Sequence, residues 1–392
     1  DGNEITRIDH ADGSNWRYTY DDRGRLYWAI RYSNGDTLSD WYQYTYDDAD
    51  NMTQYWRFNY VAQTTDTWDY GYNAANQQTS MTLNSGTAET RTYDDWGRLT
   101  ARAQGAYSAA YTYRYGDRLR QVTSSFPGET ATSPVYEYGG DGKLRRRGSE
   151  EIRYGLGFNP VAERTWALAV KTFVYEPHKA VSERLAYLGG GFDANQHYYC
   201  HDHLGSVRRT RSSAKASLAV WDYEPFGKVH SGTATPLIFA LHPYESGMGF
   251  FTAPYRNYSP AMARWTTRDP MGMVDGPNMY GYVTDNPISL VDHDGRFIAI
   301  CGGIAVGVGV AIAWGGLSTS TAGTAIGVGL AAGGLFATVY TATSVVINTL
   351  NIFRRAAEKI REQLRENSEI DTPEEIIVDL IDRESDIRDL IP

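Results

Sequence analysis

A repeat built around tyrosine constrains the fold of this chain more than any other feature of its sequence. An aromatic-rich run followed by Tyr-Asp-x-x-Gly-Arg-Leu, or a variant of that motif, recurs at Tyr20, Tyr46, Tyr72, Tyr93, Tyr115 and Tyr138. The differences between these residue numbers are 26, 26, 21, 22 and 23. This is the length of one β-hairpin and its turn rather than of a helical repeat. Each repeat is therefore predicted to be one hairpin.

The residues around each tyrosine explain how such a hairpin forms. The run Trp16-Arg17-Tyr18-Thr19-Tyr20 alternates, which places its aromatic residues on one face of a strand. The Asp-x-x-Gly or Asp-x-x-Asn step then supplies the side-chain acceptor and the residue tolerant of positive φ that a tight turn requires. A single hairpin cannot bury its own apolar face, but stacked hairpins form a continuous sheet. Residues 1–150 are thus predicted to form a long β-strip.

Composition agrees with β-structure and excludes some functions. The chain has 30 Tyr and 12 Phe, and Tyr suits a half-buried pleated surface. A formal net charge of −10 argues against a general nucleic-acid binder, which needs Lys and Arg to release counterions from phosphates. Cys200 and Cys301 lie in segments of different character and predict neither a disulfide framework nor a metal cluster. Because the chain opens at Asp1 inside a strand-like pattern, we expect an N-terminal portion of the same protein to precede it.

Two features allow more than one interpretation. The rows of Tyr and Trp could form a carbohydrate-binding face, although packing between repeats explains the same spacing. His201 and His203 could present both rings on one face of a strand as a metal pair. No further ligand cluster accompanies them in the sequence, so we expect no metal and no cofactor.

An ordered series of short motifs runs from residue 198 to residue 296. It comprises Asp202-His203-Leu204-Gly205-Ser206, Tyr223-Glu224-Pro225-Phe226-Gly227, Tyr255-Arg256-Asn257-Tyr258-Ser259-Pro260, Arg264-Trp265, Arg268-Asp269-Pro270-Met271-Gly272, Asn278-Met279-Tyr280-Gly281-Tyr282, Asn286-Pro287 and Asp292-His293-Asp294-Gly295-Arg296. This series resembles the signature of the bacterial Rhs/YD-repeat family with its repeat-associated core module, a family that includes polymorphic toxins, toxin-complex C subunits and teneurin-like shells. The resemblance covers residues 1 to about 297.

The resemblance implies a mainly β architecture in which the repeats spiral into a hollow shell. Residues 151–240 would continue the shell wall, and residues 241–297 would form a core module that plugs it and separates it from a variable C-terminal cargo. A complete family shell is longer than this chain. The remaining N-terminal shell of the same protein is therefore an expected partner.

The resemblance also implies a self-cleavage site. Asp269 and Asp292 match the aspartates of the family's two Asp-Pro-x-Gly motifs, and Arg256 matches an arginine of the core module. In the family these positions serve an intramolecular aspartyl-type cleavage after the second motif, here close to the Arg296-Phe297 bond. Two neighbouring carboxylates can share a proton, so that one acts on a water as base while the other protonates the amide. The protein would then be at most a single-turnover protease acting on itself.

A plainer role for both aspartates is also open, because Asp-Pro-x-Gly is a common turn sequence. The second motif departs from the family pattern, with His293 in place of Pro and Arg296 in place of Leu. The catalytic aspartates match the pattern, but the residues beside the expected scissile bond do not.

The composition changes abruptly after the core module. Residues 298–353 contain no Asp, Glu, Lys or Arg, and the stretches 297–314 and 323–347 approach the ~20 apolar residues of a membrane helix. Glycines four apart, such as Gly303 and Gly307, would let two helices approach closely. We expect an α-helical apolar hairpin at 298–353 that contacts a membrane through residues Phe297 to Ile347, or a helical pair stowed inside the shell. Residues 354–392 are predicted to form an amphipathic helical tail.

These observations favour an Rhs-type shell and plug that carries a C-terminal cargo. The protein would be a polymorphic toxin or surface effector with a membrane-inserting tail, secreted or at the cell surface, with an immunity protein as a possible partner. The alternative is a non-toxic structural or adhesive surface protein whose strip binds glycans or proteins and whose tail is a membrane anchor. A third hypothesis makes it mainly an autoprotease.

Overall fold

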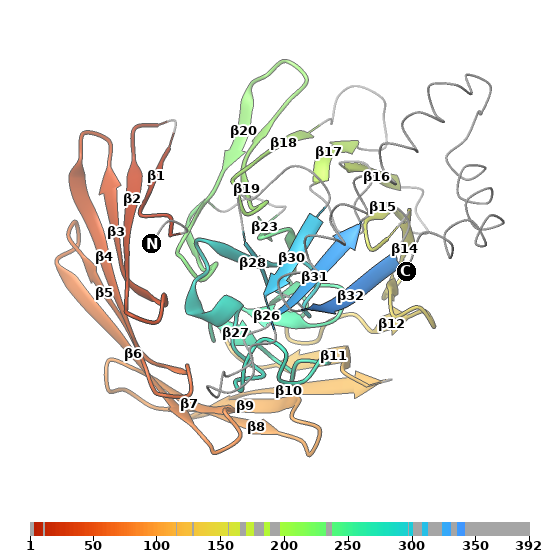
Figure 1. Ribbon diagram of the computed structural model, residues 1–392, viewed down its shortest axis with the longest axis horizontal. Coiled ribbons are helices and arrows are strands. Elements are labelled where there is room, and N and C mark those ends of the chain that lie inside the picture. Colours follow the sequence, from red (N-terminus) through yellow and green to blue (C-terminus); the bar gives the residue numbers. More distant parts are fainter. Residues whose placement is uncertain are drawn as a thin grey trace. The chain divides into compact units, whose positions relative to one another are not determined.

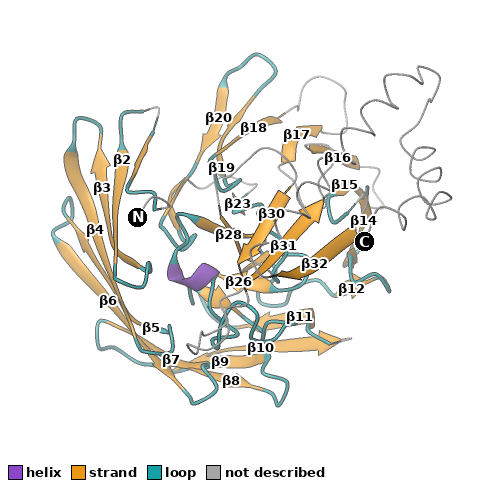
Figure 2. Cartoon of the chain, viewed as in Figure 1, coloured by secondary structure: helices purple, strands orange, loops and turns teal. Residues whose placement is uncertain are grey.

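Antiparallel strands dominate the computed structural model of the protein, as Figure 2 shows. In the described part of the chain the helical element is one short 3-10 turn. The chain divides into two compact units, of which the first comprises residues 1–316 and 327–337 and the second comprises residues 317–326 and 338–392. The structure describes residues 4–10, 12–114, 116–127, 129–155, 157–164, 170–175, 184–188, 197–232, 237–296, 298–300, 308–312, 324–330 and 335–341.

The predicted strip is an antiparallel sheet whose strands pair strictly in chain order, and Figure 1 shows them side by side from red to orange. This order is what consecutive hairpins produce. Its strands are β1 (Arg7–Asp9), β2 (Asn15–Tyr20), β3 (Leu26–Ser33), β4 (Thr37–Tyr46), β5 (Met52–Asn59), β6 (Thr64–Tyr72), β7 (Gln78–Leu83), β8 (Glu89–Tyr93), β9 (Leu99–Gln104), β10 (Tyr107–Arg114) and β11 (Arg118–Ser124).

The repeat tyrosines occupy equivalent positions, as the sequence predicts. The Tyr46 hydroxyl donates a hydrogen bond to the Leu26 carbonyl at 2.8 Å, and that of Tyr72 donates to the Met52 carbonyl at 2.7 Å. Each acceptor is the residue that begins a strand after the preceding turn. A β-bulge immediately before each tyrosine turns its side chain towards that acceptor. Tyr20, Tyr93 and Tyr138 make the corresponding bonds to Ile5, Gln78 and Leu119.

The fifth copy differs from the predicted register. There the bulge precedes Tyr113, and the Tyr113 hydroxyl donates to the Leu99 carbonyl at 2.8 Å. Tyr113, rather than Tyr115, is therefore the equivalent tyrosine. The sequence Tyr113-Arg114-Tyr115 offers two candidates, and only strand pairing distinguishes them.

The aspartate after each tyrosine organises the turn. Asp47 Oδ1 accepts hydrogen bonds from the backbone N–H groups of Ala49 and Asn51, each at 2.9 Å. Asp50 then adopts φ +57°, the left-handed conformation that Asp and Asn tolerate better than most residues. The same two bonds are made by Asp21, Asn73 and Asp94 in their own turns.

A second antiparallel sheet continues the repeat, again with its strands in chain order. Asp202 accepts from the N–H groups of Leu204 and Ser206, and a bulge precedes His201. The Asp202-to-Ser206 motif is thus a repeat turn with histidine in the tyrosine position. The strands are β12 (Tyr136–Tyr138), β13 (Leu144–Arg147), β14 (Glu150–Tyr154), β15 (Pro160–Arg164), β16 (Val170–Tyr175), β17 (Arg184–Leu188), β18 (His197–His201), β19 (Val207–Arg211) and β20 (Ser217–Val220).

Much of the core comes from residues two positions before a tyrosine that follows a β-bulge, or before His201 in β18; Arg91, before Tyr93, is a charged exception. Alternation along a strand places this residue on the inner face, where burial of large aromatic rings supplies most of the apolar area. The resulting clusters also include Leu26, Leu99 and Leu119, which follow the turns. The buried residues in this position are Tyr18, Tyr44, Tyr70, Tyr111, Tyr136, Ile152, Phe173, Tyr199 and Trp221.

Short elements from residue 222 onwards pack against these clusters. One 3-10 turn, η1 (Val283–Asp285), has positive φ at all three residues. The strands are β21 (Asp222–Tyr223), β22 (Val229–Ser231), β23 (Ile238–Phe239), β24 (His242–Glu245), β25 (Phe250–Thr252), β26 (Asn257–Ser259), β27 (Arg264–Trp265), β28 (Leu290–Asp292) and β29 (Ile298–Ile300).

The helical prediction for residues 298–353 is wrong wherever the structure describes them. In place of a helical hairpin, strands lie at β29, β30 (Val308–Ile312), β31 (Thr324–Leu330) and β32 (Leu335–Thr341). Runs such as Val308-Gly309-Val310-Ala311-Ile312 alternate small and β-branched residues, and both glycine and β-branched residues disfavour a helix. Among the described residues, no helix has the length and apolarity to span a membrane. The predicted amphipathic tail at 354–392 lies outside the described residues.

Candidate functional site

The structure brings Arg256, Asp269 and Asp292 together, although they come from three different segments. Arg256 immediately precedes β26, Asp269 lies in the loop after β27, and Asp292 ends β28. Backbone hydrogen bonds join these segments. The Asp269 N–H donates to the Met279 carbonyl at 2.9 Å, and the Tyr255 N–H donates to the Asp294 carbonyl at 3.0 Å.

One guanidinium nitrogen of Arg256 pairs with both aspartates. Its Nη2 lies 2.8 Å from Asp269 Oδ2 and 2.9 Å from Asp292 Oδ2. The exposed fractions of the three side chains are 3%, 5% and 1%. Charges this deeply buried persist only when they are paired and hydrogen-bonded. The Arg256 guanidinium also stacks over the Trp265 ring at 4.3 Å and donates through Nε to the Gly295 carbonyl at 2.5 Å.

The two oxygens of each aspartate have separate partners. Asp292 Oδ1 accepts from the N–H groups of Gly295 at 2.8 Å and Arg296 at 3.0 Å, which is a turn interaction. Asp269 Oδ1 accepts from the Met271 N–H at 2.7 Å in the same manner. The turn role predicted from the sequence therefore exists. The turn hydrogen bonds occupy only Oδ1 of each carboxylate, and Oδ2 forms the ion pair with Arg256.

A third carboxylate, which no sequence motif marks, belongs to this site. Burial raises the pKa of Asp275 to about 6, and the negative charges of Asp292 and Asp269 add to the effect. Burial also raises the pKa of Asp269, against the lowering influence of Arg256. In the sequence, Asp275-Gly276-Pro277 has the character of an ordinary turn. Its proximity to the other two aspartates is a property of the fold.

A small cavity of about 40 Å³ separates these groups. A space of this size holds one or a few waters, since about 10–15 Å³ of such volume suffices for one. Its lining includes Arg256, Asp269, Asp275, Asp292 and Ile298. The cavity therefore combines one guanidinium, Ile298 and room for water with several carboxyls, those of Asp50, Asp269, Asp275, Asp285 and Asp292.

The core-module motifs attach this site to the row of repeat turns. Asn278 Nδ2 donates to the Asp50 carbonyl at 2.8 Å, and Asn286 Nδ2 donates to the Gly24 carbonyl at 3.0 Å. The Tyr280 hydroxyl donates to the Gly97 carbonyl at 2.8 Å. Each acceptor is the residue of positive φ in a repeat turn. Three residues of the core-module motifs thus attach to three different repeat turns.

A comparison with protein families identifies the repeat itself. Residues 72–109, which include the turn at Tyr93, match the family model described as RHS Repeat. The chain therefore contains an RHS repeat.

Curated relatives of this RHS-repeat chain include two toxin components. The toxin subunit YenC2 of Yersinia entomophaga is 32% identical over 85 residues, which is 20% of this chain and 9% of the relative. The toxin protein Tse5 of Pseudomonas aeruginosa is 23% identical over 228 residues, 54% of this chain and 16% of the relative. The chain therefore spans only a small part of each. A solved structure, TcdB2-TccC3-TEV, aligns with 74% of this chain and with 18% of its own chain. The sequence identity is 18% and the TM-score is 0.36.

The predicted histidine pair of the RHS-repeat protein is not arranged as a metal site. His201 ends β18, whereas His203 lies in the following turn, where its Nε2 is 2.8 Å from the Ile288 carbonyl. Among the residues that the structure describes, no group of three or more His, Cys, Asp or Glu side chains could hold a metal ion.

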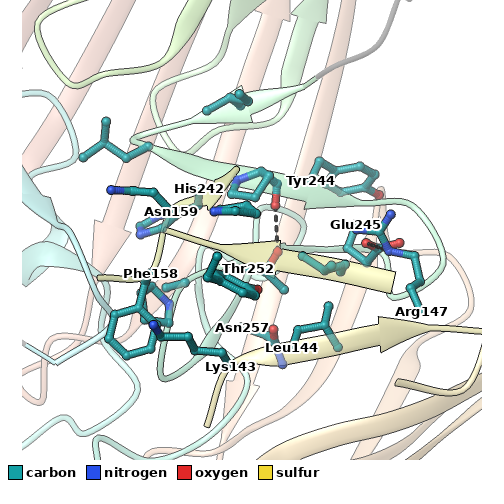
Figure 3. Close-up of a pocket in the computed structure, with 18 of the residues that line it drawn as sticks. Lys143, Leu144, Arg147, Phe158, Asn159, His242, Tyr244, Glu245, Thr252 and Asn257 are labelled. Atoms are coloured by element: carbon teal, nitrogen blue, oxygen red, sulfur yellow. Dashed lines mark hydrogen bonds and ion pairs between the residues drawn. The ribbon is translucent and has the colours of Figure 1, made fainter. Parts of the chain in front are cut away.

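A second and larger cavity, of about 530 Å³, lies beside the core module, and Figure 3 shows part of its lining. Arg147 Nε lies 2.7 Å from Glu245 Oε2 at its wall, and the Thr252 hydroxyl donates to the Pro243 carbonyl at 3.0 Å. Phe158 and Lys143 also line it. This cavity mixes charged, polar and aromatic groups.

Proposed function

We propose that this RHS-repeat protein is a shell and plug that cleaves its own chain after Arg296, separating the shell from the residues that follow. The observation that supports this is the position of Asp292. One oxygen accepts from the Arg296 N–H at 3.0 Å, and the other lies 2.9 Å from Arg256. A buried, charge-paired carboxylate therefore touches the backbone next to the expected scissile bond.

The reaction needs only water as a second reactant. A carboxylate of the Asp269 and Asp292 pair takes a proton from a water in the small cavity, and the resulting hydroxide adds to the Arg296 carbonyl carbon. The carbon–nitrogen bond to residue 297 then breaks as the leaving nitrogen receives the proton that the carboxylate took from the water. The products are a carboxylate on Arg296 and an amine on residue 297. Arg256 holds both aspartates in place through charge-assisted bonds.

Intact-mass analysis of the full 392-residue chain tests this function. We expect the wild-type chain to yield two fragments whose new ends are Arg296 and Phe297. Asp269→Asn and Asp292→Asn keep the side-chain size but remove the carboxylate, so each should remain uncut while retaining its fold by circular dichroism. A wild-type chain that stays intact after long incubation would leave both aspartates with their turn and ion-pair roles alone.

The names of the two toxin relatives support a toxin-related cargo. We place this cargo after residue 297, where the composition becomes uncharged, and expect a secreted or cell-surface protein with a membrane-inserting tail. A small membrane immunity protein encoded by the neighbouring gene would support a toxin. Induced expression in bacteria should then slow growth, and co-expression of that neighbour should restore it.

An adhesive surface protein is the second candidate, and one observation favours it. Trp28, Trp41 and Trp56 form a row of half-buried rings on the face of the first sheet opposite Tyr42 and Tyr44. Their centroids are 5.6 and 5.5 Å apart, in edge-to-face geometry. Glycan binding that Trp56→Ala abolishes, in a chain without toxicity, would favour this candidate over the toxin.

A further inference from the structure

We propose that Asn278 is a positioning residue of the cleavage site, which holds Arg256 and Asp269 in place while one repeat turn is docked on the core module. This role rests on the self-cleavage proposed above. It makes the rate of cleavage depend on contact between the first sheet and the core module, so that a chain whose repeat turn is undocked keeps its C-terminal residues attached.

The carboxamide of Asn278 joins the core module to the repeat turn at residues 47–51. Its Nδ2 lies 3.1 Å from the Ala49 carbonyl, 2.8 Å from the Asp50 carbonyl and 2.9 Å from Asn51 Oδ1. Its Oδ1 accepts from Arg264 Nη2 at 3.1 Å. Three oxygens of one turn therefore share the two N–H donors of a single amide, which fixes the position of Asn278.

The next residue, Met279, carries this position into the cleavage site. Its carbonyl accepts from the Asp269 N–H at 2.9 Å and from Arg256 Nη1 at 3.4 Å. One backbone carbonyl is thus shared by two of the three residues of the site. A shift of the backbone at Asn278 would move this carbonyl, and with it the partner of both groups.

The ion pairs of the site are sensitive to such a shift. Arg256 Nη2 lies between Asp269 Oδ2 and Asp292 Oδ2, at 2.8 and 2.9 Å. The Met279 carbonyl contacts the other terminal nitrogen of the same guanidinium. Buried charges are stabilised only by well-aligned partners, and a misplacement of about 1 Å at a reacting group can slow a reaction by about 10²-fold. Docking of one repeat turn therefore has a direct route to the cleavage rate.

Asn286 offers a matched comparison in the same core module. Its Nδ2 donates to the Gly24 carbonyl of another repeat turn at 3.0 Å, and its Oδ1 accepts from the Ser289 N–H at 3.1 Å. These side-chain hydrogen bonds involve neither Arg256 nor the Met279 carbonyl. Loss of the Asn286 contact should therefore weaken docking without displacing the ion pairs of the site.

Cleavage kinetics of newly synthesised full-length chain test the proposal. The wild type, Asn278→Asp, Asn278→Ala and Asn286→Asp are made by cell-free translation and followed on denaturing gels. Aspartate keeps the size of asparagine but turns a carboxylate oxygen towards the turn oxygens, whereas alanine removes the contact without adding a charge. We expect both Asn278 variants to cleave about 10²-fold more slowly than the wild type, and Asn286→Asp to cleave at the wild-type rate.

Two further measurements separate positioning from a loss of stability. Thermal unfolding is measured on the same variants with Asp292→Asn added, which keeps the chain uncut, and cleavage is then followed well below the lowest unfolding temperature. Because Arg256 lowers the pKa of Asp269, a looser contact between them should raise the pH below which Asn278→Ala cleavage slows. A loss of stability alone would leave this pH profile unchanged.

The outcomes distinguish this inference from the proposed function. If the wild type cleaves and the Asn278 variants cleave at the same rate, self-cleavage stands and the positioning role is refuted. The same conclusion follows if Asn286→Asp slows cleavage as much as Asn278→Asp, or if Asn278→Ala is slow but keeps the wild-type pH profile. If the wild type itself never cleaves, the proposed function is refuted together with this inference.

Discussion

His242 should make the core module sensitive to acid. Its side chain is only 1% exposed, and burial lowers its pKa to about 4. The ring lies edge-on to Trp265 at 6.0 Å, its Nε2 is 3.4 Å from the His293 carbonyl, and its Nδ1 has no hydrogen-bond partner. The folded protein therefore holds this histidine neutral at a pH where an unfolded chain would protonate it.

The magnitude follows from the difference between the two pKa values. Because the folded-state pKa is lowered, the unfolded state binds more protons between pH 6.5 and about 4, and stability falls as pH decreases through this window. Between pH 7.5 and 4.5 the expected loss is about 2.5 kcal/mol, since each unit of pKa difference corresponds to about 1.4 kcal/mol. This is a large share of the stability of an ordinary domain.

Urea denaturation at pH 7.5 and 4.5 measures this loss. The His242→Gln side chain stays neutral in this pH range and can still donate to the His293 carbonyl. Lowering the pH from 7.5 to 4.5 should therefore reduce the free energy of unfolding of this variant by about 2.5 kcal/mol less than it reduces that of the wild type. The matched control is His203→Gln, which alters an exposed histidine and should leave the wild-type difference unchanged. Equal losses in the wild type and His242→Gln would refute the reasoning.

Two further predictions concern the turns and the tail. Gly205 and Gly116 both have positive φ, but a Cβ at Gly205 would collide with the Leu241 side chain, whereas one at Gly116 meets nothing within 4 Å. Gly205→Ala should therefore lower the melting temperature by several degrees more than Gly116→Ala, because it adds steric overlap to the strain that both share; equal shifts would show that the turn relaxes freely. If residues 297–392 insert into lipid, the cleaved protein should release dye from loaded vesicles, because residues 298–353 carry no charged side chain that would oppose entry into the hydrocarbon. Vesicles that stay sealed would leave an anchor or a stowed segment.

The residues after the core module illustrate where sequence patterns become ambiguous. Apolar composition alone is compatible with a membrane helix and with a strand, because both bury their side chains. In the described part of this region, alternation of small and β-branched residues accompanies strands. The length of the apolar stretches and the glycine spacing favour a helix, whereas the period-two pattern favours a strand. In the described residues the helical prediction is wrong.

The site shows a different limit of the sequence. The resemblance selects Arg256, Asp269 and Asp292, and the structure joins all three within ion-pair distance. Asp275 carries no motif, because its raised pKa depends on burial and on two charges brought close by other loops. Desolvation and charge proximity are properties of assembled segments, so a single segment does not reveal them.

By itself, the sequence determined the hairpin strip. Strand alternation, the Asp acceptor and the residue of positive φ are local, and in each repeat they require only neighbours within a few positions, as at Asp47 and Asp50. Tertiary structure alone decided that Tyr113 rather than Tyr115 is the fifth repeat tyrosine, since strand pairing sets the register. It also decided how each aspartate divides its two oxygens between a turn and Arg256, because Arg256 belongs to a different segment, immediately before β26. That division creates a buried, paired cluster beside Arg296 in place of two ordinary turns.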